Sequence, residues 1–67
     1  MPKYPKIKVE ITLHGPDGNA FVILGRVQRA LRHAKVSENE IDTFLEEAMS
    51  GGYDNLLQTC RNWVEVS

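Results

Sequence analysis

Polar and apolar side chains alternate strictly over residues 6–13. The apolar positions within residues 6–13 are Ile7, Val9, Ile11 and Leu13. A period of two with β-branched side chains is typical of a strand that buries one face. We therefore predict a strand over Lys6–Leu13. Two prolines precede it, and they favour a flexible leader over residues 1–5.

From Ala20 the apolar spacing changes to that of an α-helix, after a turn cluster at 14–18 and a good N-cap at Asn19. One helical face collects small and aliphatic residues, namely Ala20, Ile23, Leu24, Val27, Ala30, Leu31 and Ala34. The opposite face collects basic residues, namely Arg26, Arg29, Arg32 and His33. We predict a helix over 20–34 that is the centre of the core and exposes its basic face.

Two further helices are predicted downstream. Ser37 and Glu40 have the spacing of a capping box at the start of the second helix. The apolar positions of this helix are Ile41, Phe44, Leu45, Ala48 and Met49. Gly51 is expected to end it as a left-handed cap. The third helix is predicted over Tyr53–Asn62, and its inner face holds Tyr53, Leu56, Leu57 and Cys60.

The last residues, Trp63–Val66, change to β-type side chains. We predict a short C-terminal strand that pairs with Lys6–Leu13, because strand backbone groups need hydrogen-bond partners. The competing solution is a homodimer in which Lys6–Leu13 pairs with its copy in a second chain. The favoured fold is therefore α+β, with an N-terminal strand, a three-helix core and a short C-terminal strand. It forms one small domain over residues 1–67.

Charge is distributed unevenly along the chain, although the net charge is only −1. Residues 1–35 hold seven of the eight Lys and Arg residues, whereas residues 36–67 hold seven of the nine Asp and Glu residues. Two explanations stay open. The basic half could bind an anionic partner, or the two halves could complement one another within the folded domain.

A mid-helix glycine, Gly25, lies on the outer side of the first helix beside Phe21. Glycine at such a position costs about 1 kcal/mol relative to alanine, so it needs a structural or functional reason. A partner could approach the helix closely there, between Arg29 and Arg32. Alternatively, the third helix or the C-terminal strand could pack on Gly25 inside the domain. The candidate partner-binding residues are Phe21, Gly25, Arg29 and Arg32.

Two classes of function follow from this helix. The first is a small protein-interaction module that docks a partner on the outer face of the helix. The alternative is an accessory nucleic-acid-binding protein, whose phosphate contacts would come from Arg26, Arg29, Arg32 and Lys35. The slightly acidic composition and the lack of an aromatic base-stacking motif disfavour this alternative.

No residue pattern predicts an enzyme, a bound metal or a cofactor. Cys60 lies on an inner helical face, as a small core residue would. The histidines, His14 and His33, have no metal-ligand or catalytic spacing to other groups. The turn at 15–19 lacks the lysine pattern of a phosphate-binding loop.

The chain also lacks an apolar run of about 20 residues, which a membrane span requires. A single cysteine fits a reducing compartment better than secretion. We therefore expect a cytoplasmic protein that makes no contact with a membrane.

Several segments together resemble a group of short hypothetical proteins from bacterial genomes, plasmids and phages. These segments are Asp17-Gly18-Asn19-Ala20-Phe21 and Ser50-Gly51-Gly52-Tyr53-Asp54-Asn55-Leu56-Leu57. The group carries a D-G-N-A-F segment and a later S-G-D-Y-D/N-x-L-L segment, and this chain has Gly52 where that pattern has aspartate. The resemblance covers roughly residues 7–60. It implies a bacterial or mobile-element origin and transfers no activity.

Overall fold

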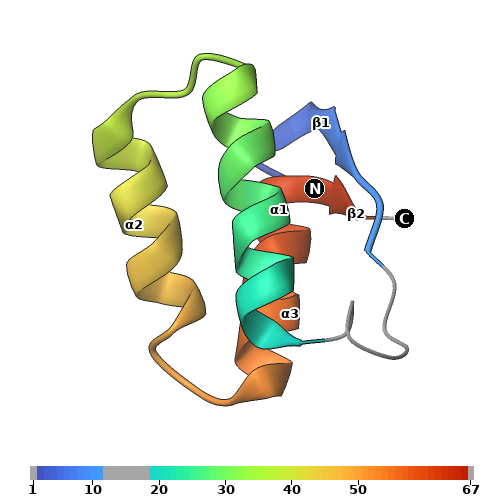
Figure 1. The fold of residues 1–67 in the computed structure, drawn as a ribbon, viewed down its shortest axis with the longest axis vertical. Coiled ribbons are helices and arrows are strands. Elements are labelled where there is room, and N and C mark those ends of the chain that lie inside the picture. The colour runs from blue at the N-terminus through green and yellow to red at the C-terminus, as the bar shows by residue number, and fades with distance from the viewer. Residues whose placement is uncertain (1, 12–18, 67) are drawn as a thin grey trace.

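The computed structural model describes residues 2–11 and 19–66. The elements in chain order are β1 (Tyr4–Val9), α1 (Ala20–His33), α2 (Glu38–Ala48), α3 (Tyr53–Trp63) and β2 (Val64–Val66). Figure 1 shows α1 and α2 side by side, with α3 and the two strands behind α1. The predicted α+β fold is confirmed, including the C-terminal strand that pairs with the first.

The two strands run parallel, and their register pairs Tyr4 with Val64 and Val9 with Val66. All three helices lie between them in sequence and supply the crossover that a parallel pair requires. β2 begins directly after the last residue of α3. The pairing that we favoured within one chain is therefore present.

β1 begins earlier than the alternation predicted, so Tyr4 and Pro5 belong to the strand rather than to a flexible leader. Aromatic packing explains the difference, since the ring of Tyr4 lies 6.0 Å from that of Trp63. The backbone N–H of Lys3 also donates to the carbonyl oxygen of Asn62 at 2.8 Å. The strand ends at Val9, and the predicted strand positions Thr12 and Leu13 lie outside the described residues.

α1 supplies the largest part of the core, as its apolar spacing predicted. Ile23, Val27 and Leu31 are completely buried. They pack with buried residues from the other elements, namely Val9, Ile41, Phe44, Ala48, Leu56, Cys60, Trp63 and Val64. Phe44 and Trp63 meet edge to face with their ring centroids 5.7 Å apart. The core therefore lies where the three helices and the sheet converge.

The connection from α1 to α2 contains the one non-glycine residue with positive φ in the described chain, Lys35 at 65°. The N–H of Lys35 donates to Arg32 and that of Val36 donates to Leu31. These two bonds are the pair that defines a Schellman motif, in which the left-handed position is usually glycine. Lysine therefore occupies a strained position at the end of α1.

Two details of helix capping differ from the sequence prediction. The hydroxyl of Ser37 accepts from the N–H of Glu40 as expected, but the Glu40 carboxylate binds Lys3 and Tyr4 instead of completing a capping box. Gly51 does not adopt a left-handed conformation. A Cβ on Gly51 would lie 2.9 Å from the Cβ of Asn55, so the glycine is needed for close approach.

Candidate docking surface

The outer face of α1 presents Phe21, Gly25 and Arg29 at four-residue intervals. The Phe21 side chain is 81% exposed, and Arg29 is exposed as well. A Cβ placed on Gly25 would meet nothing within 4 Å among residues 2–11 and 19–66. Neither α3 nor β2 packs there, so the alternative in which Gly25 serves internal packing is wrong. The structure therefore leaves open space over the glycine, between an exposed aromatic ring and an arginine.

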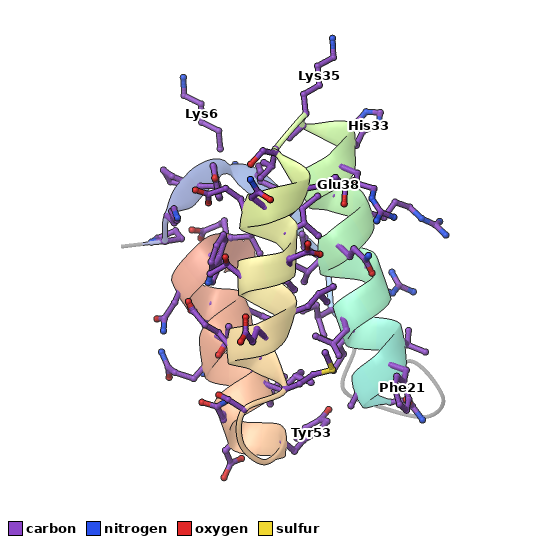
Figure 2. The ribbon with its side chains drawn as sticks, turned by 90° about the vertical axis from the view of Figure 1, so that its left-hand side faces the viewer. Lys6, Phe21, His33, Lys35, Glu38 and Tyr53 are labelled. Carbon is purple, nitrogen blue, oxygen red and sulfur yellow. The ribbon has the colours of Figure 1, made fainter. Side chains whose placement is uncertain are left out.

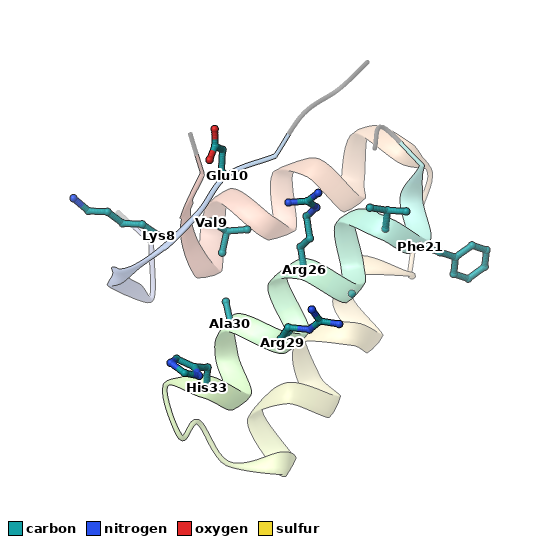
Figure 3. Close-up of a pocket in the computed structure, with 10 residues that line it drawn as sticks. Lys8, Val9, Glu10, Phe21, Arg26, Arg29, Ala30 and His33 are labelled. Carbon is teal, nitrogen blue, oxygen red and sulfur yellow. The ribbon is translucent and has the colours of Figure 1, made fainter. Parts of the chain in front are cut away.

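An open groove of about 730 Å³ runs between β1 and α1. Its apolar part includes Val9, Val22 and Ala30, and Gly25 lies along it. Most of the ionisable residues that line it in the described part of the chain are basic, namely Lys8, Arg26, Arg29 and His33, and Glu10 is acidic. Figure 3 shows Arg26 and Arg29 extending from α1 along the groove, with Phe21 pointing outward at one end. A groove with this lining can accept a chain that carries acidic and apolar side chains.

The remaining predicted site residues lie apart from this groove. Arg32 forms an ion pair with Glu38 of α2, with Nε and Oε1 3.1 Å apart. This contact raises the pKa of the Arg32 guanidinium. Lys35 lines a different surface pocket together with Lys3 and Lys6. The structure thus groups Phe21, Gly25, Arg26 and Arg29, and it adds Lys8 and His33 to them.

Lys8 is not among the candidate site residues that we selected from the sequence. The signal that could have found it was the predicted packing of Val9 on α1, since the residues flanking a buried strand position lie along the helix. His33 was recognised on the basic face but was not included in either candidate set.

A second, apolar hollow of about 260 Å³ lies at one end of the helices. It is lined by residues from α1 and by residues at the α2–α3 connection, among them Phe21, Leu24, Met49 and Tyr53. Met49 and Tyr53 are 59% and 44% exposed, although their spacing had placed them on inner faces. Both lie at helix ends, where the core no longer covers them. Figure 2 shows Phe21 and Tyr53 at this same end.

α2 carries the opposite charge on its exposed side. Glu38, Asp42 and Glu46 are exposed and recur every four residues. The ion pair from Arg32 to Glu38 shows that this acidic ridge borders α1. The outer surface of the α1–α2 pair is therefore basic on one helix and acidic on the other.

Other chemistry is less well supported in the described part of the chain. Residues 2–11 and 19–66 contain no cluster of three or more His, Cys, Asp or Glu residues that could hold a metal ion. Cys60 is buried, and desolvation raises the pKa of its thiol to about 11, which opposes a role as a nucleophile. None of the helices described in these ranges is long and apolar enough to cross a membrane.

Comparisons with known proteins do not assign this chain to a group. No family model, curated protein or solved structure matches it.

Proposed function

We propose that this protein is a small protein-interaction module that docks a partner on the outer face of α1. The observation that carries the proposal is the open space over Gly25, where an added Cβ would touch none of the residues that the structure describes. Gly25 carries a cost in helix stability that no contact within the described chain explains. A partner that lies close to the helix backbone explains it.

The residues around Gly25 indicate the chemistry of the partner surface. Phe21 offers an exposed aromatic ring, which is the kind of side chain that anchors protein interfaces. Arg29 and the neighbouring cations of the groove favour acidic side chains. Charge complementarity of this kind mainly speeds association and sets orientation, while the apolar contact contributes affinity. The favoured partner surface is therefore acidic with at least one apolar anchor.

The proposal can be tested by NMR with an amphipathic helical peptide that carries glutamate on one side and leucine on the other. Backbone amides of residues 21–29 should shift on titration, and the affinity should fall as salt rises. Gly25→Leu should fold normally and bind at least about tenfold more weakly, and Gly25→Ala should show a smaller loss of affinity because its side chain is smaller. The proposal would be overturned by chemical-shift changes confined to other surfaces, or by a Gly25→Leu variant that binds the peptide with wild-type affinity.

The second candidate function is nucleic-acid binding through the same groove. Lys8, Arg26, Arg29 and His33 support it because they line one cavity. Two residues of the predicted set weaken it, since Arg32 pairs with Glu38 and Lys35 lies in another pocket. An electrophoretic mobility shift assay with duplex and single-stranded oligonucleotides at low and moderate salt tests nucleic-acid binding. A salt-dependent shift supports this function, and no shift removes it.

The homodimer through β1 that the sequence left open is less favoured than docking on α1. In the described part of the chain one edge of β1 is unpaired, because the sheet there has two strands in the order β1–β2. Lys6 and Lys8 are exposed on that strand, however, and Pro5 lacks a backbone N–H. Lysine and proline on an edge strand oppose pairing with a copy of itself.

A further inference from the structure

α1 and α2 lie antiparallel, and contacts at both ends fix which of their residues lie at the same height. At one end Arg32 pairs with Glu38. At the other end Phe21 and Met49 line the same apolar hollow. Figure 2 places Glu38 and Phe21 at opposite ends of the helices, in agreement with these contacts.

Intermediate positions follow from the helical repeat. One turn from Arg32 towards the start of α1 lies Arg29, and one turn from Glu38 along α2 lies Asp42. A further turn on each helix brings Gly25 to the height of Glu46. The outer surface thus has an α1 column and an α2 column. From one end to the other the α1 column is Phe21, Gly25, Arg29 and Arg32, and the α2 column is Met49, Glu46, Asp42 and Glu38.

We infer that this surface binds a second copy of the same chain, related by a two-fold axis parallel to α1 and α2. The inference rests on the proposed function and names its partner. Rotation about such an axis places α1 of each copy over α2 of the other and leaves every residue at its own height. Arg29 then faces Asp42 of the second copy, and Phe21 faces Met49 of the second copy.

The space over Gly25 fits this arrangement. Helices pack with their axes 8–10 Å apart, and the distance is set by the side chains at the point of contact. Gly25 lies in the middle of the α1 column, at the height of Glu46. Without a side chain there, α2 of the second copy can approach the backbone of α1 closely. This close approach explains the glycine, because an alanine or a larger residue would hold the two helices further apart.

Charge complementarity is the reason to prefer a second copy over another acidic protein. The α1 column is basic and the α2 column is acidic, so a two-fold contact uses both columns on both chains and makes each pair twice. Within the described chain neither Arg29 nor Asp42 forms an ion pair, although the Asp42 carboxylate also acts electrostatically on Arg32. Both side chains can therefore take part in this contact. An antiparallel arrangement of α1 on α1 would instead bring arginines together, and the charges therefore also select the orientation.

The apolar residue at the end of each column contributes favourable free energy when it is buried. Phe21 is 81% exposed and Met49 is 59% exposed in the single chain. Both would lose contact with water when they meet across the axis, and apolar burial stabilises by roughly 25 cal/mol per Å². The charged pairs would then set register, while Phe21 and Met49 hold the two copies together.

Charge reversal tests this arrangement directly. Wild-type protein should show a concentration-dependent monomer–dimer equilibrium in sedimentation experiments, and the dimer should weaken as salt rises. Arg29→Glu alone and Asp42→Arg alone should each raise the dimer dissociation constant at least about tenfold. An equimolar mixture of the two variants should recover the dimer, because the mixed pair restores an attractive contact on both sides of the axis.

Matched controls separate this effect from a general change of charge. Arg61→Glu and Glu65→Arg make the same charge changes at exposed positions on α3 and β2. Both should leave the dimer unchanged. Circular dichroism should show that all four variants are folded. A mixture that stays monomeric, or controls that weaken the dimer as much, would overturn the inference.

The outcomes also separate this inference from the proposed function. A wild-type chain that stays monomeric at high concentration overturns the dimer, while peptide-induced shifts at residues 21–29 would still support docking on α1. A dimer that resists both charge reversals but is broken by Lys8→Glu would overturn the helical arrangement and place the contact at β1.

Discussion

The hydroxyl of Tyr4 donates a 2.8 Å hydrogen bond to Oε2 of Glu40, across 36 positions of sequence. The same carboxylate oxygen lies 2.7 Å from Nζ of Lys3. Lys3 in turn stands 4.4 Å from the ring centroid of Trp63, close enough for a cation–π contact. These contacts join the start of β1 to the start of α2 and to the end of α3. Glu40 is the residue on which they converge.

Glu40→Gln should therefore reduce the acid sensitivity of the fold. The Lys3 ammonium and the Tyr4 hydroxyl hold the pKa of the Glu40 carboxyl below its ordinary value of 4.5. A lowered pKa in the folded state stabilises the fold above the ordinary value, and this contribution is lost as pH falls through the lowered one. Urea unfolding at a series of pH values should show a shallower acid decline for the variant than for the wild type.

Glu46→Gln is the matched control, because Glu46 is exposed on α2 and lies outside these contacts. Its acid profile should follow that of the wild type. If Glu40→Gln and the wild type lose stability in parallel below pH 4.5, the role assigned to Glu40 is wrong.

Lys35→Gly should stabilise the protein. Lys35 has a φ of 65°, and a side chain in this left-handed region costs about 1–2 kcal/mol. Glycine removes that strain but gains freedom in the unfolded chain, so the net increase in the free energy of unfolding should be about 1 kcal/mol. Chemical denaturation measures it. Lys35→Ala keeps the Cβ and should not raise the free energy of unfolding comparably. Equal increases for the two variants would show that the backbone at Lys35 is not strained.

Alanine at Gly25 and alanine at Gly51 should have opposite effects. Gly25→Ala meets open space and improves helix propensity, which should raise the free energy of unfolding by up to about 1 kcal/mol. For a domain of this size that corresponds to a rise of about 4–8 °C in melting temperature.

Gly51→Ala places its Cβ 2.9 Å from the Cβ of Asn55. The clash should displace Asn55, whose amide donates to the carbonyl oxygen of Glu47 at 2.9 Å near the end of α2. Overpacking of this kind typically costs 1–3 kcal/mol, so the melting temperature should fall. Thermal unfolding measures both variants. If the two melting temperatures shift in the same direction, the environments described for Gly25 and Gly51 are wrong.

The Cys60 thiol should react with an aromatic disulfide reagent only when the domain opens. Its side chain is completely buried, and its pKa of about 11 leaves little thiolate at neutral or mildly alkaline pH. The observed rate should therefore rise with denaturant in step with unfolding. The unfolded protein in high denaturant serves as the control. Rapid, complete modification under native conditions would contradict the burial.

Hydrophobic spacing was sufficient to predict the main elements of this fold. In α1 the period of 3.6 identified Ile23, Val27 and Leu31, and all three are completely buried. The change to β-type residues at Trp63–Val66 predicted β2, although Trp63 itself is the last residue of α3. Both signals are local, because the burial of one face leaves a repeating pattern in the sequence itself.

Features that depend on distant contacts were not predicted. The start of β1 at Tyr4 depends on Trp63, and the role of Gly51 depends on the position of Asn55. Met49 and Tyr53 fit inner-face spacing but lie at helix ends, where their side chains are 59% and 44% exposed. For the candidate site, Phe21, Gly25 and Arg29 were found because they share one helix face. Lys8 was missed because β1 and α1 are brought together only by the fold.

The pairing of β1 with β2 has a consequence for how the chain is made. Tyr4 is paired with Val64, so the sheet joins segments that lie on either side of all three helices in the sequence. During synthesis the helices can meet one another as they leave the ribosome, but β1 finds its partner only after all three helices and β2 have emerged. Closing so long a loop is entropically costly and slows folding. The sheet should therefore be the last part of the domain to form.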